Sequence, residues 1–229
     1  MSNQGYVDKR CSSCFAGARR KQIRESQPST DLSLNSLFRK LSSAMGKKAL
    51  LFLAPGAEEM EAVISVDVLR RAGLEVTVAG LCEASEPIKC SRGVLIKPDI
   101  NVSEAKGPYD ILLLPGGLGG SQSLSKSKEV GDLLKQQQNE GRWISAICAA
   151  PTALKAHGIG LGKKITSYPA MKDQLTDSYD YKEDNVVIDG NLITSRGPGT
   201  AFDFALAIVQ ALEGKEKAQE VAKGMLLNA

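Results

Sequence analysis

Cys148 lies in the part of this sequence that is best suited to nucleophilic chemistry. The stretch 145–151 (SAICAAP) joins an apolar run that predicts a strand to the start of a predicted helix. A nucleophile elbow has this arrangement, although its usual letters are Gly-x-Ser-x-Gly. Small residues at 146 and 150 permit the tight turn, and the partial positive charge of a helix N-terminus favours a thiolate. A buried, inert structural cysteine is the alternative, and the local pattern does not separate the two.

A nucleophilic thiol often works with a base, and the chain has one histidine, His157. It follows Cys148 on what is predicted to be the same helix, roughly 14 Å away along the axis at a rise of 1.5 Å per residue. We therefore interpret His157 as an exposed residue near a helix C-terminus. Glu61 is the carboxylate alternative. Acids in the first turn of a helix usually complement its dipole. A carboxyl buried against the sulfur would instead have a raised pKa, could remain protonated, and could donate a hydrogen bond to a thiolate or its oxides.

Two adjacent glycines, Gly116 and Gly117, end another predicted strand after Pro115. Glycines at such a turn allow the backbone to approach a ligand closely and to aim an amide at it. Together with the amide of Ala149 they predict an oxyanion hole, although a Gly-Gly pair is also common in ordinary turns. The lone C-x-x-C formed by Cys11 and Cys14 lacks a second pair, so a zinc site is not expected.

The elements that must position these residues alternate along the chain. Apolar runs predict strands at 49–54, 74–79, 111–114, 143–147, 164–167, 186–188 and 192–194, with a short antiparallel excursion at 88–97. Helices are predicted at 58–72, 128–140, 149–156, 200–212 and 215–224. This alternation predicts an α/β fold with a doubly wound, mainly parallel sheet and helices on both faces. Ligands bind such sheets outside the carboxyl ends of the strands, which is where the three motifs fall.

Composition narrows the class of protein. The 229 residues suit one domain with an appendage, and the hydrophobic content of 42% is ordinary for a globular protein. Five cysteines, an odd number in a chain of this size, favour reduced thiols over a disulfide scaffold. No apolar run approaches the roughly 18 residues that a membrane span needs. The formal net charge of +3 is mild, so specific nucleic-acid recognition is not expected.

Residues 1–45 differ from the rest of the chain. They hold eight Lys or Arg and three Asp or Glu, so they carry a net charge of +5 and leave −2 on the remainder. We predict a disordered basic extension, followed by one domain over 46–229. Apolar residues within 34–41 follow helical spacing, typical of a targeting element, a docking helix or a transient helix without function. The Arg- and Ser-rich composition resembles a mitochondrial presequence, but the acids count against it, and we expect a cytoplasmic protein, with mitochondrion and nucleus as alternatives.

From residue 48 onward, the sequence resembles a known family. The matching stretches are LAPGAEEME (53–61), DVLRRAGLEVTVAGL (67–81), LPGG (114–117), AICAAPTAL (146–154) and LITSRGPGTAFDFALAIV (192–209). They identify the chain as a member of the ThiJ/PfpI superfamily, in the DJ-one branch that holds the Parkinson-disease-associated deglycase. The resemblance implies a flavodoxin-like fold, a homodimer, and no metal or organic cofactor.

The resemblance also implies residue roles. It places the reactive, oxidisable cysteine on Cys148, its partner glutamate on Glu61, and the oxyanion-binding amides on Gly117 and Ala149, beside Gly116. It implies a cysteine-dependent deglycase and glyoxalase that acts on glyoxal, methylglyoxal and their early adducts on proteins or nucleotides. A non-enzymatic redox sensor or redox-dependent chaperone that operates through oxidation of Cys148 is the alternative, in keeping with a role in oxidative-stress protection. Peptidase activity is a more distant alternative function.

One pocket residue departs from the family pattern. Tyr168 stands where the close relative has a histidine. Its phenol, with an ordinary pKa of about 10, does not replace imidazole as a base near neutral pH. A mechanism that depends on that histidine is therefore not expected here.

Overall fold

The apolar run near residue 50 forms the strand at the centre of a large sheet. The computed structural model describes residues 46–82 and 86–227. In it, β1 (Lys48–Leu53) pairs in parallel with β2 (Glu75–Gly80) on one side and with β6 (Ile111–Leu114) on the other. Five of the six residues of β1 are buried, as expected of a strand that is covered on both faces.

The central sheet has seven strands, in the order β10-β11-β7-β6-β1-β2-β5. The remaining strands are β5 (Ile100–Asn101), β7 (Trp143–Ile147), β10 (Val186–Asp189) and β11 (Leu192–Ser195), with β10 and β5 at the two edges. Neighbouring strands are parallel, except that β10 and β11 run antiparallel. The predicted α/β fold with a mainly parallel, flavodoxin-like sheet is therefore confirmed.

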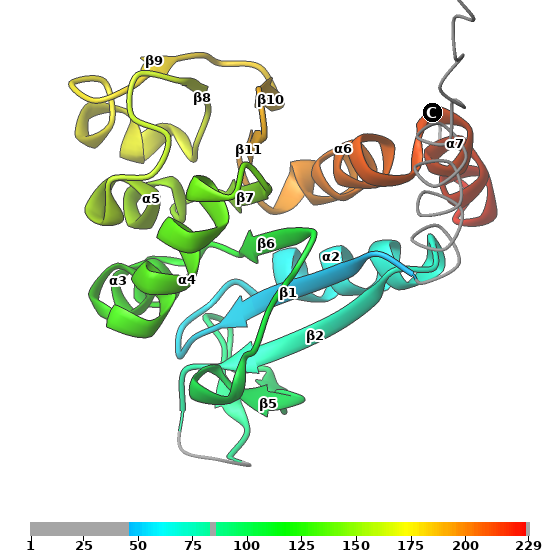
Figure 1. The fold of residues 1–229 in the computed structure, drawn as a ribbon, viewed down its shortest axis with the longest axis horizontal. Helices are drawn as coiled ribbons and strands as arrows, with labels where there is room; N and C mark the ends of the chain where they lie inside the picture. Colours follow the sequence, from blue (N-terminus) through cyan, green and yellow to red (C-terminus); the bar gives the residue numbers. More distant parts are fainter. Residues whose placement is uncertain (1–45, 83–85, 228–229) are drawn as a thin grey trace, which may run out of the picture. The chain divides into compact units, whose positions relative to one another are not determined.

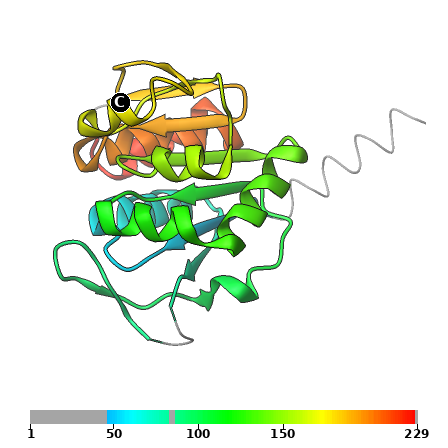
Figure 2. The ribbon, with the colours of Figure 1, turned by 90° about the vertical axis from the view of Figure 1, so that its left-hand side faces the viewer.

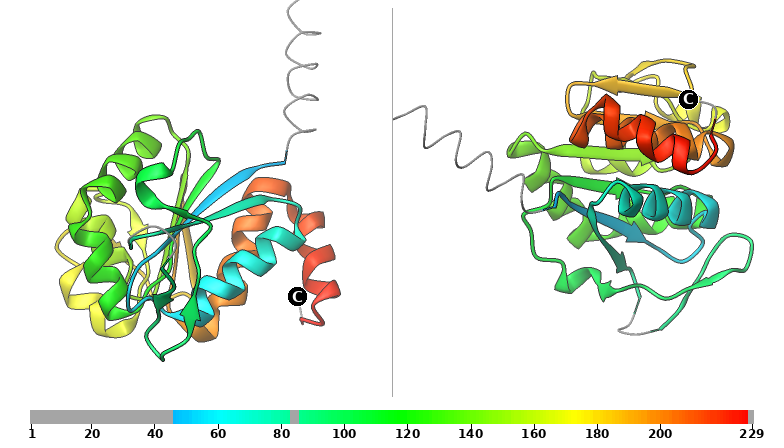
Figure 3. Two further views of the ribbon diagram at one scale, coloured as in Figure 1. Left: turned by 90° about the horizontal axis from the view of Figure 1, so that it is seen from below. Right: turned by 90° about the vertical axis from the view of Figure 1, so that its right-hand side faces the viewer.

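Helices cover both faces of the sheet (Figures 1 and 3). One layer consists of α2 (Glu59–Arg71), α6 (Ala201–Glu213) and α7 (Lys215–Gly224). The other consists of α3 (Leu118–Lys126), α4 (Lys128–Asn139) and α5 (Pro151–His157). Alternate residues of β1 divide between the two layers: Leu51 packs into the first core and Phe52 into the second. This is the two-sided burial that a period of two produces.

Smaller elements complete the described part of the chain. The antiparallel excursion expected at 88–97 is the hairpin β3 (Ile88–Lys89) and β4 (Leu95–Ile96), and β8 (Lys164–Ile165) pairs in parallel with β9 (Asp180–Tyr181). In the view of Figure 2 these segments flank the sheet on opposite sides. Three short 3-10 helices are η1 (Val102–Glu104), η2 (Pro169–Gln174) and η3 (Pro198–Thr200). No helix among the described residues is long and apolar enough to cross a membrane.

The sequence missed two strands and one long helix. The strands β5 and β9 have two residues each, too few for a periodic pattern. The helix α3 has the sequence LGGSQSLSK, with two glycines and few apolar residues, so no helical stripe is visible. The helix expected to start at residue 149 begins at Pro151, because Ala149 and Ala150 belong to the turn that follows β7.

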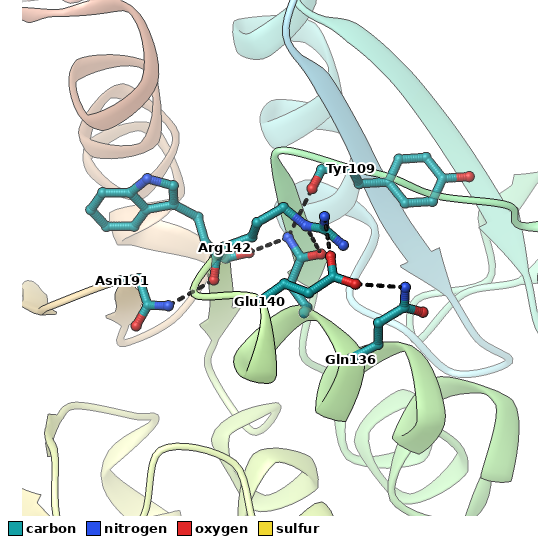
Figure 4. Close-up of polar contacts among 7 residues, drawn as sticks. Tyr109, Gln136, Glu140, Arg142 and Asn191 are labelled. Carbon is teal, nitrogen blue, oxygen red and sulfur yellow. Dashed lines mark hydrogen bonds and ion pairs between the residues drawn. The ribbon is translucent and has the colours of Figure 1, made fainter.

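A polar cluster fixes the amino ends of β6 and β7, opposite to the edge that carries the motifs. The buried amide of Gln137 donates to the carbonyls of Tyr109 and Trp143, at 3.1 and 3.0 Å, and accepts from Arg142 Nε at 3.0 Å. Asn191 Nδ2 donates to the carbonyl of Arg142 at 2.8 Å (Figure 4). These bonds satisfy backbone groups that the ends of the strands would otherwise bury unpaired.

Candidate active site

Cys148 sits on a strained turn at the carboxyl end of β7. Its φ of 62° lies in the left-handed region, which a residue other than glycine rarely adopts. Its backbone N–H donates to the Ser195 carbonyl at 3.0 Å, which ties the turn to the neighbouring strand β11. Cys148 is 8% exposed. A nucleophile elbow places its reactive residue in this way, on a strained backbone conformation at the end of a strand.

Gly116 makes room for this turn. A Cβ atom at Gly116 would lie 2.6 Å from Cβ of Cys148, 2.8 Å from the Ile147 carbonyl oxygen and 2.9 Å from the Ala149 amide nitrogen. Real Cβ atoms do not approach so closely, so a side chain at position 116 would push the elbow out of place. The first glycine of the pair, for which the sequence left an ordinary turn as the alternative, is therefore packed directly against Cys148.

Glu61 reaches the same place from the first turns of α2. Its side chain is fully buried, and Oε2 accepts a 2.7 Å hydrogen bond from the Gly116 amide. The Glu58 carboxylate caps the helix by accepting from the Glu61 amide at 2.9 Å. The second carboxyl oxygen of Glu61, Oε1, is buried and has no hydrogen-bond partner of ordinary geometry among the described residues. The expectation that Glu61 points inward therefore matches the structure.

Burial decides the electrostatics of Glu61. It raises the pKa of this carboxyl to about 7 from its ordinary 4.5, with a smaller contribution from the charge of Glu58 and opposing hydrogen bonds from Gly116 and Cys148. A buried carboxyl prefers its neutral form because the low-dielectric interior disfavours the charge. Glu61 is thus placed to hold a proton beside the thiol near neutral pH.

The pKa of Cys148 is raised, whereas a nearby helix N-terminus was expected to lower it by favouring the thiolate. Burial raises it to about 12, the negative charge of an ionised Glu61 adds to the rise, and hydrogen bonds from the amides of Gly117 and Ala149 oppose it. The helix α5 starts only at Pro151, so its first amides do not compensate. The pKa of Cys148 is high because its thiolate would be buried beside the negative charge of an ionised Glu61. The pair of Cys148 and Glu61 therefore holds a single negative charge over a broad range of pH. A thiolate at Cys148 therefore requires a protonated Glu61.

The two amides aimed at the sulfur come from different strand ends. Ala149 follows Cys148 within the turn, and Gly117 caps α3 with a φ of 80°. A Cβ at Gly117 would lie 2.8 Å from the Glu58 amide nitrogen, so this position also needs glycine. Donors from two backbone segments that converge on one atom have the geometry of an oxyanion hole. Because β7, β6 and β1 are neighbours in the sheet, their carboxyl ends bring Cys148, Gly117 and Glu61 together.

A cavity of about 610 Å³ opens over the Cys148 thiol. Tyr168 lies on its wall, as expected, with its backbone N–H donating to the Cys148 carbonyl at 2.8 Å. The remaining lining residues, beside Cys148 and Tyr168, come from six loops and helix starts: Gly56, Glu58, Ser91, Arg92, Gly117, Leu118, Gly119, Ala149, Ala170, Met171 and Pro198. The volume suits a small organic molecule.

Glu59 has a role that the sequence did not reveal. As an acid in the first turn of α2, it would ordinarily only complement the helix dipole. In the structure it is buried, Oε2 accepts from the Ser91 hydroxyl and Oε1 from the Arg92 amide, both at 2.8 Å. These bonds fix the loop that forms one side of the cavity. The two partners lie more than 30 positions away, so no local pattern announces the contact.

His157 is not brought to the thiol. It ends α5, as expected, but it is half-buried rather than exposed: Nε2 lies 2.9 Å from the Leu124 carbonyl, and the ring packs against Gly131. The expected exposure was wrong because α3, which the sequence did not predict, covers this side of α5.

The other cysteines differ from Cys148 in their surroundings. Cys90 is buried, and burial with the nearby Glu59 and Glu58 raises its pKa to about 11. Cys82 is half-buried, and its pKa is also raised by burial. Cys11 and Cys14, with the rest of the extension 1–45, lie outside the described residues. Within the ranges 46–82 and 86–227 no group of three or more His, Cys, Asp or Glu side chains is arranged to hold a metal ion.

Comparison with known proteins identifies the family of this chain. The DJ-1/PfpI family model matches residues 47–211. Protein dj-1beta of Drosophila melanogaster is 58% identical over 185 residues, which span 80% of this chain and 98% of the relative. Its crystal structure superposes with a TM-score of 0.79 and covers 81% of this chain and all of that one.

Two further relatives have informative names. A protein of Caenorhabditis elegans named glutathione-independent glyoxalase DJR-1.2 is 46% identical over 187 residues, covering 80% of this chain and 98% of the relative. The structure titled "Toxoplasma gondii DJ-1, oxidized" is 35% identical, with a TM-score of 0.76, and covers 80% of this chain and all of that one. With an elbow cysteine, a buried glutamate and this degree of identity over its folded part, the chain belongs to the DJ-1/PfpI family.

Proposed function

We propose that this protein is a glyoxalase and deglycase that needs no cofactor and uses Cys148 as its nucleophile. The observation that carries the proposal is the thiol on a strained elbow, with two backbone amides aimed at the sulfur and a buried carboxyl of raised pKa beside it. The relative named as a glutathione-independent glyoxalase supports the reaction class. Glyoxal and methylglyoxal are small enough for the cavity above the thiol.

The first step uses the pair of Cys148 and Glu61. With the shared proton on Glu61, the sulfur adds to the aldehyde carbon, so a C–S bond forms and the carbonyl π bond opens onto its oxygen. The amides of Gly117 and Ala149 donate to that developing oxyanion, and Glu61 supplies the proton that completes a hemithioacetal.

The second stage is an internal oxidation and reduction. Glu61, now a carboxylate, takes the proton from the former aldehyde carbon and returns it to the neighbouring carbonyl carbon, while the hydroxyl proton of the hemithioacetal passes to the oxygen of that carbonyl. The first carbon is thereby oxidised to a thioester and the second reduced to an alcohol. Water then cleaves the C–S bond, releases a 2-hydroxy acid such as lactate or glycolate, and restores the thiol. An early adduct on a protein or nucleotide amine would enter the same sequence by displacement: the sulfur forms the C–S bond, the C–N bond breaks, and Glu61 gives its proton to the leaving amine.

Turnover of methylglyoxal by the purified protein tests this function. We expect wild type to form lactate without glutathione, Cys148→Ala to lose turnover entirely, and Glu61→Gln to lose about 100-fold or more in kcat, the usual range for a proton-transfer group. Ser121→Ala removes a buried hydroxyl in the first turn of α3 and serves as the control, with a turnover rate equal to that of wild type. Turnover that persists in Cys148→Ala would falsify the mechanism.

A second role rests on the same thiol. We propose that Cys148 also acts as a redox sensor, alone or in a redox-dependent chaperone, through oxidation to the sulfinate. The protonated Glu61 favours this state, because it can donate a hydrogen bond to a sulfinate oxygen while Gly116 holds the carboxyl in place. Oxidation consumes two equivalents of peroxide and adds two oxygens to the sulfur.

Graded peroxide with peptide mapping separates this role from catalysis. We expect dioxidation at Cys148 before Cys82 or Cys90, and a less persistent sulfinate in Glu61→Ala. If Cys90 oxidises first, or if the oxidised protein binds partners and unfolded clients no differently from the reduced protein, the sensor role is wrong.

The proposed partner in the assembly is a second copy of the chain. The exposed face of α2 and the β3–β4 hairpin supports this, because Met60, Val63 and Leu95 are 52%, 52% and 64% exposed. Val63 also lines a largely apolar groove of about 310 Å³, and so does Ile96, the neighbour of Leu95 in the hairpin. A cytoplasmic location, with mitochondrion or nucleus as alternatives, remains a prediction, and its test is a reporter fused to residues 1–45.

A further inference from the structure

The residues that line the cavity over Cys148 are of two kinds. Ser91, Arg92 and Glu58 are polar or charged. Leu118 and Tyr168, with 63% and 47% of their surfaces exposed, are large and apolar or aromatic, and Ala170, Met171 and Pro198 add to the apolar lining. Large apolar side chains that remain exposed beside a reactive group offer contact area to whatever enters.

Tyr168 is held rigidly with respect to the thiol. Its N–H donates to the Cys148 carbonyl, and its own carbonyl accepts from the Met171 amide, both at 2.8 Å. The following Pro169 restricts the backbone of Tyr168 to the extended conformation that it adopts here. Because only two side-chain torsions remain, the ring loses little entropy when a ligand packs on it.

The backbone at Gly197 lies beside the ring. A Cβ at Gly197 would come within 3.5 Å of Cδ2 of Tyr168, so one edge of the ring lies close to this extended glycine. The ring lines the cavity together with Pro198 and Met171. Gly197 therefore limits one edge of the ring, while much of the Tyr168 side chain remains exposed and lines the cavity.

From this arrangement we propose that Tyr168 sets the substrate specificity of the site, in favour of α-oxoaldehydes that carry an aryl or branched alkyl group over glyoxal. The aldehyde carbon lies at the sulfur, and the apolar substituent packs on Tyr168, Leu118 and Met171. The phenol acts as a contact surface and takes no part in proton transfer, which the Cys148 and Glu61 pair supplies. The inference rests on the proposed glyoxalase function and adds the class of substrate.

The ratio of kcat/KM for phenylglyoxal to that for glyoxal measures this preference. We expect the ratio to fall about 10-fold in Tyr168→Ala, which corresponds to roughly 50 Å² of lost apolar contact at about 25 cal/mol per Å². Tyr168→Phe should keep the wild-type ratio, because it keeps the ring. Ile188→Ala removes an exposed apolar side chain on β10, outside the cavity, and should also leave the ratio unchanged.

A second readout does not depend on turnover. Iodoacetanilide carries the same electrophile as iodoacetamide but adds a phenyl ring, so the ratio of their rates at Cys148, divided by the same ratio at Cys82, reports the fit of an aryl group. We expect this normalised ratio to exceed one in wild type and in Tyr168→Phe, and to fall about 10-fold in Tyr168→Ala.

Turnover and alkylation together distinguish a failure of the proposed glyoxalase function from a failure of the inference about Tyr168. Absence of turnover with every aldehyde, together with the expected alkylation ratios, removes the proposed function but leaves Tyr168 as the aryl-binding residue. A normalised ratio that is the same in Tyr168→Ala and wild type, or failure of iodoacetanilide to label Cys148, overturns the inference.

Discussion

Gly116 donates its amide proton to Glu61 Oε2 at 2.7 Å, and this bond is fully buried. The Cα atom of the same glycine packs against the Cys148 elbow. One residue without a side chain therefore both orients the carboxyl and leaves room for the thiol. The arrangement has consequences that can be measured in the protein, beginning with the glycine itself.

Replacement of Gly116 by alanine should damage both stability and chemistry. The new Cβ would meet Cys148 Cβ, the Ile147 carbonyl and the Ala149 amide at less than 3.0 Å, so the elbow must move. We expect a loss of about 1–3 kcal/mol in the free energy of unfolding, the usual cost of overpacking, and at least a 10-fold loss of turnover. Gly199→Ala is the matched control, because nothing lies within 4 Å of its new Cβ. Equal behaviour of the two variants in urea unfolding would contradict this account.

The alkylation rate of Cys148 should report the shared proton. Because Glu61 has a pKa of about 7 and Cys148 one of about 12, the pair loses its first proton near pH 7 and its second near pH 12. We expect the rate with iodoacetamide in wild type to rise with a midpoint near pH 7 and then to change little until strongly alkaline pH. Glu61→Gln leaves one titrating group and should show a single midpoint between these values. A single midpoint at the pH of an ordinary thiol in both proteins would contradict the coupling.

Glu61 should also make stability depend on pH. Its pKa is higher in the folded protein than its ordinary 4.5, so the folded state binds the proton more tightly. The resulting stabilisation is fully present below about pH 4.5 and is lost as the pH rises through 7. A shift of this size corresponds to about 3 kcal/mol.

Urea unfolding of Glu61→Gln measures this contribution, in a Cys148→Ala background that removes the thiol from the titration. The difference in unfolding free energy, parent minus Gln variant, should fall by about 3 kcal/mol between pH 4 and pH 8. A difference that stays constant within about 1 kcal/mol would show that the carboxyl is not buried in solution.

Self-association should depend on the exposed face of α2. Light scattering after gel filtration is expected to give twice the monomer mass for wild type. Val63→Asp places a charge in the apolar groove and should yield monomers at micromolar concentration. Ile188→Asp, a comparable change on β10, should remain dimeric. A monomeric wild type, or a Val63→Asp variant that still dimerises, would place the interface elsewhere or exclude it.

The sequence predicted the parts of this site that depend on local pattern. The strand, turn and helix around Cys148 were visible in residues 145–151, and the opening of α2 placed Glu61 at the same edge. The contacts of Glu59 were not visible, because its partners Ser91 and Arg92 belong to a distant loop. The raised pKa of Cys148 was missed for a related reason. It depends on burial and on a charge brought there by the fold, and neither can be read from the residues around the cysteine.

The order of the central strands sets when in folding the thiol acquires its special properties. Glu61 and Gly116 are 55 positions apart, and Cys148 follows β7, which lies still further along the chain. Contacts between residues so far apart form slowly, because the intervening loops must first close. A nascent or partly folded chain therefore carries an ordinary cysteine, with a pKa near 8.5 and no neighbouring proton donor. Reactivity at Cys148 becomes a signature of the completed sheet, and an aldehyde or peroxide probe applied during refolding would follow the closure of β1, β6 and β7 in time.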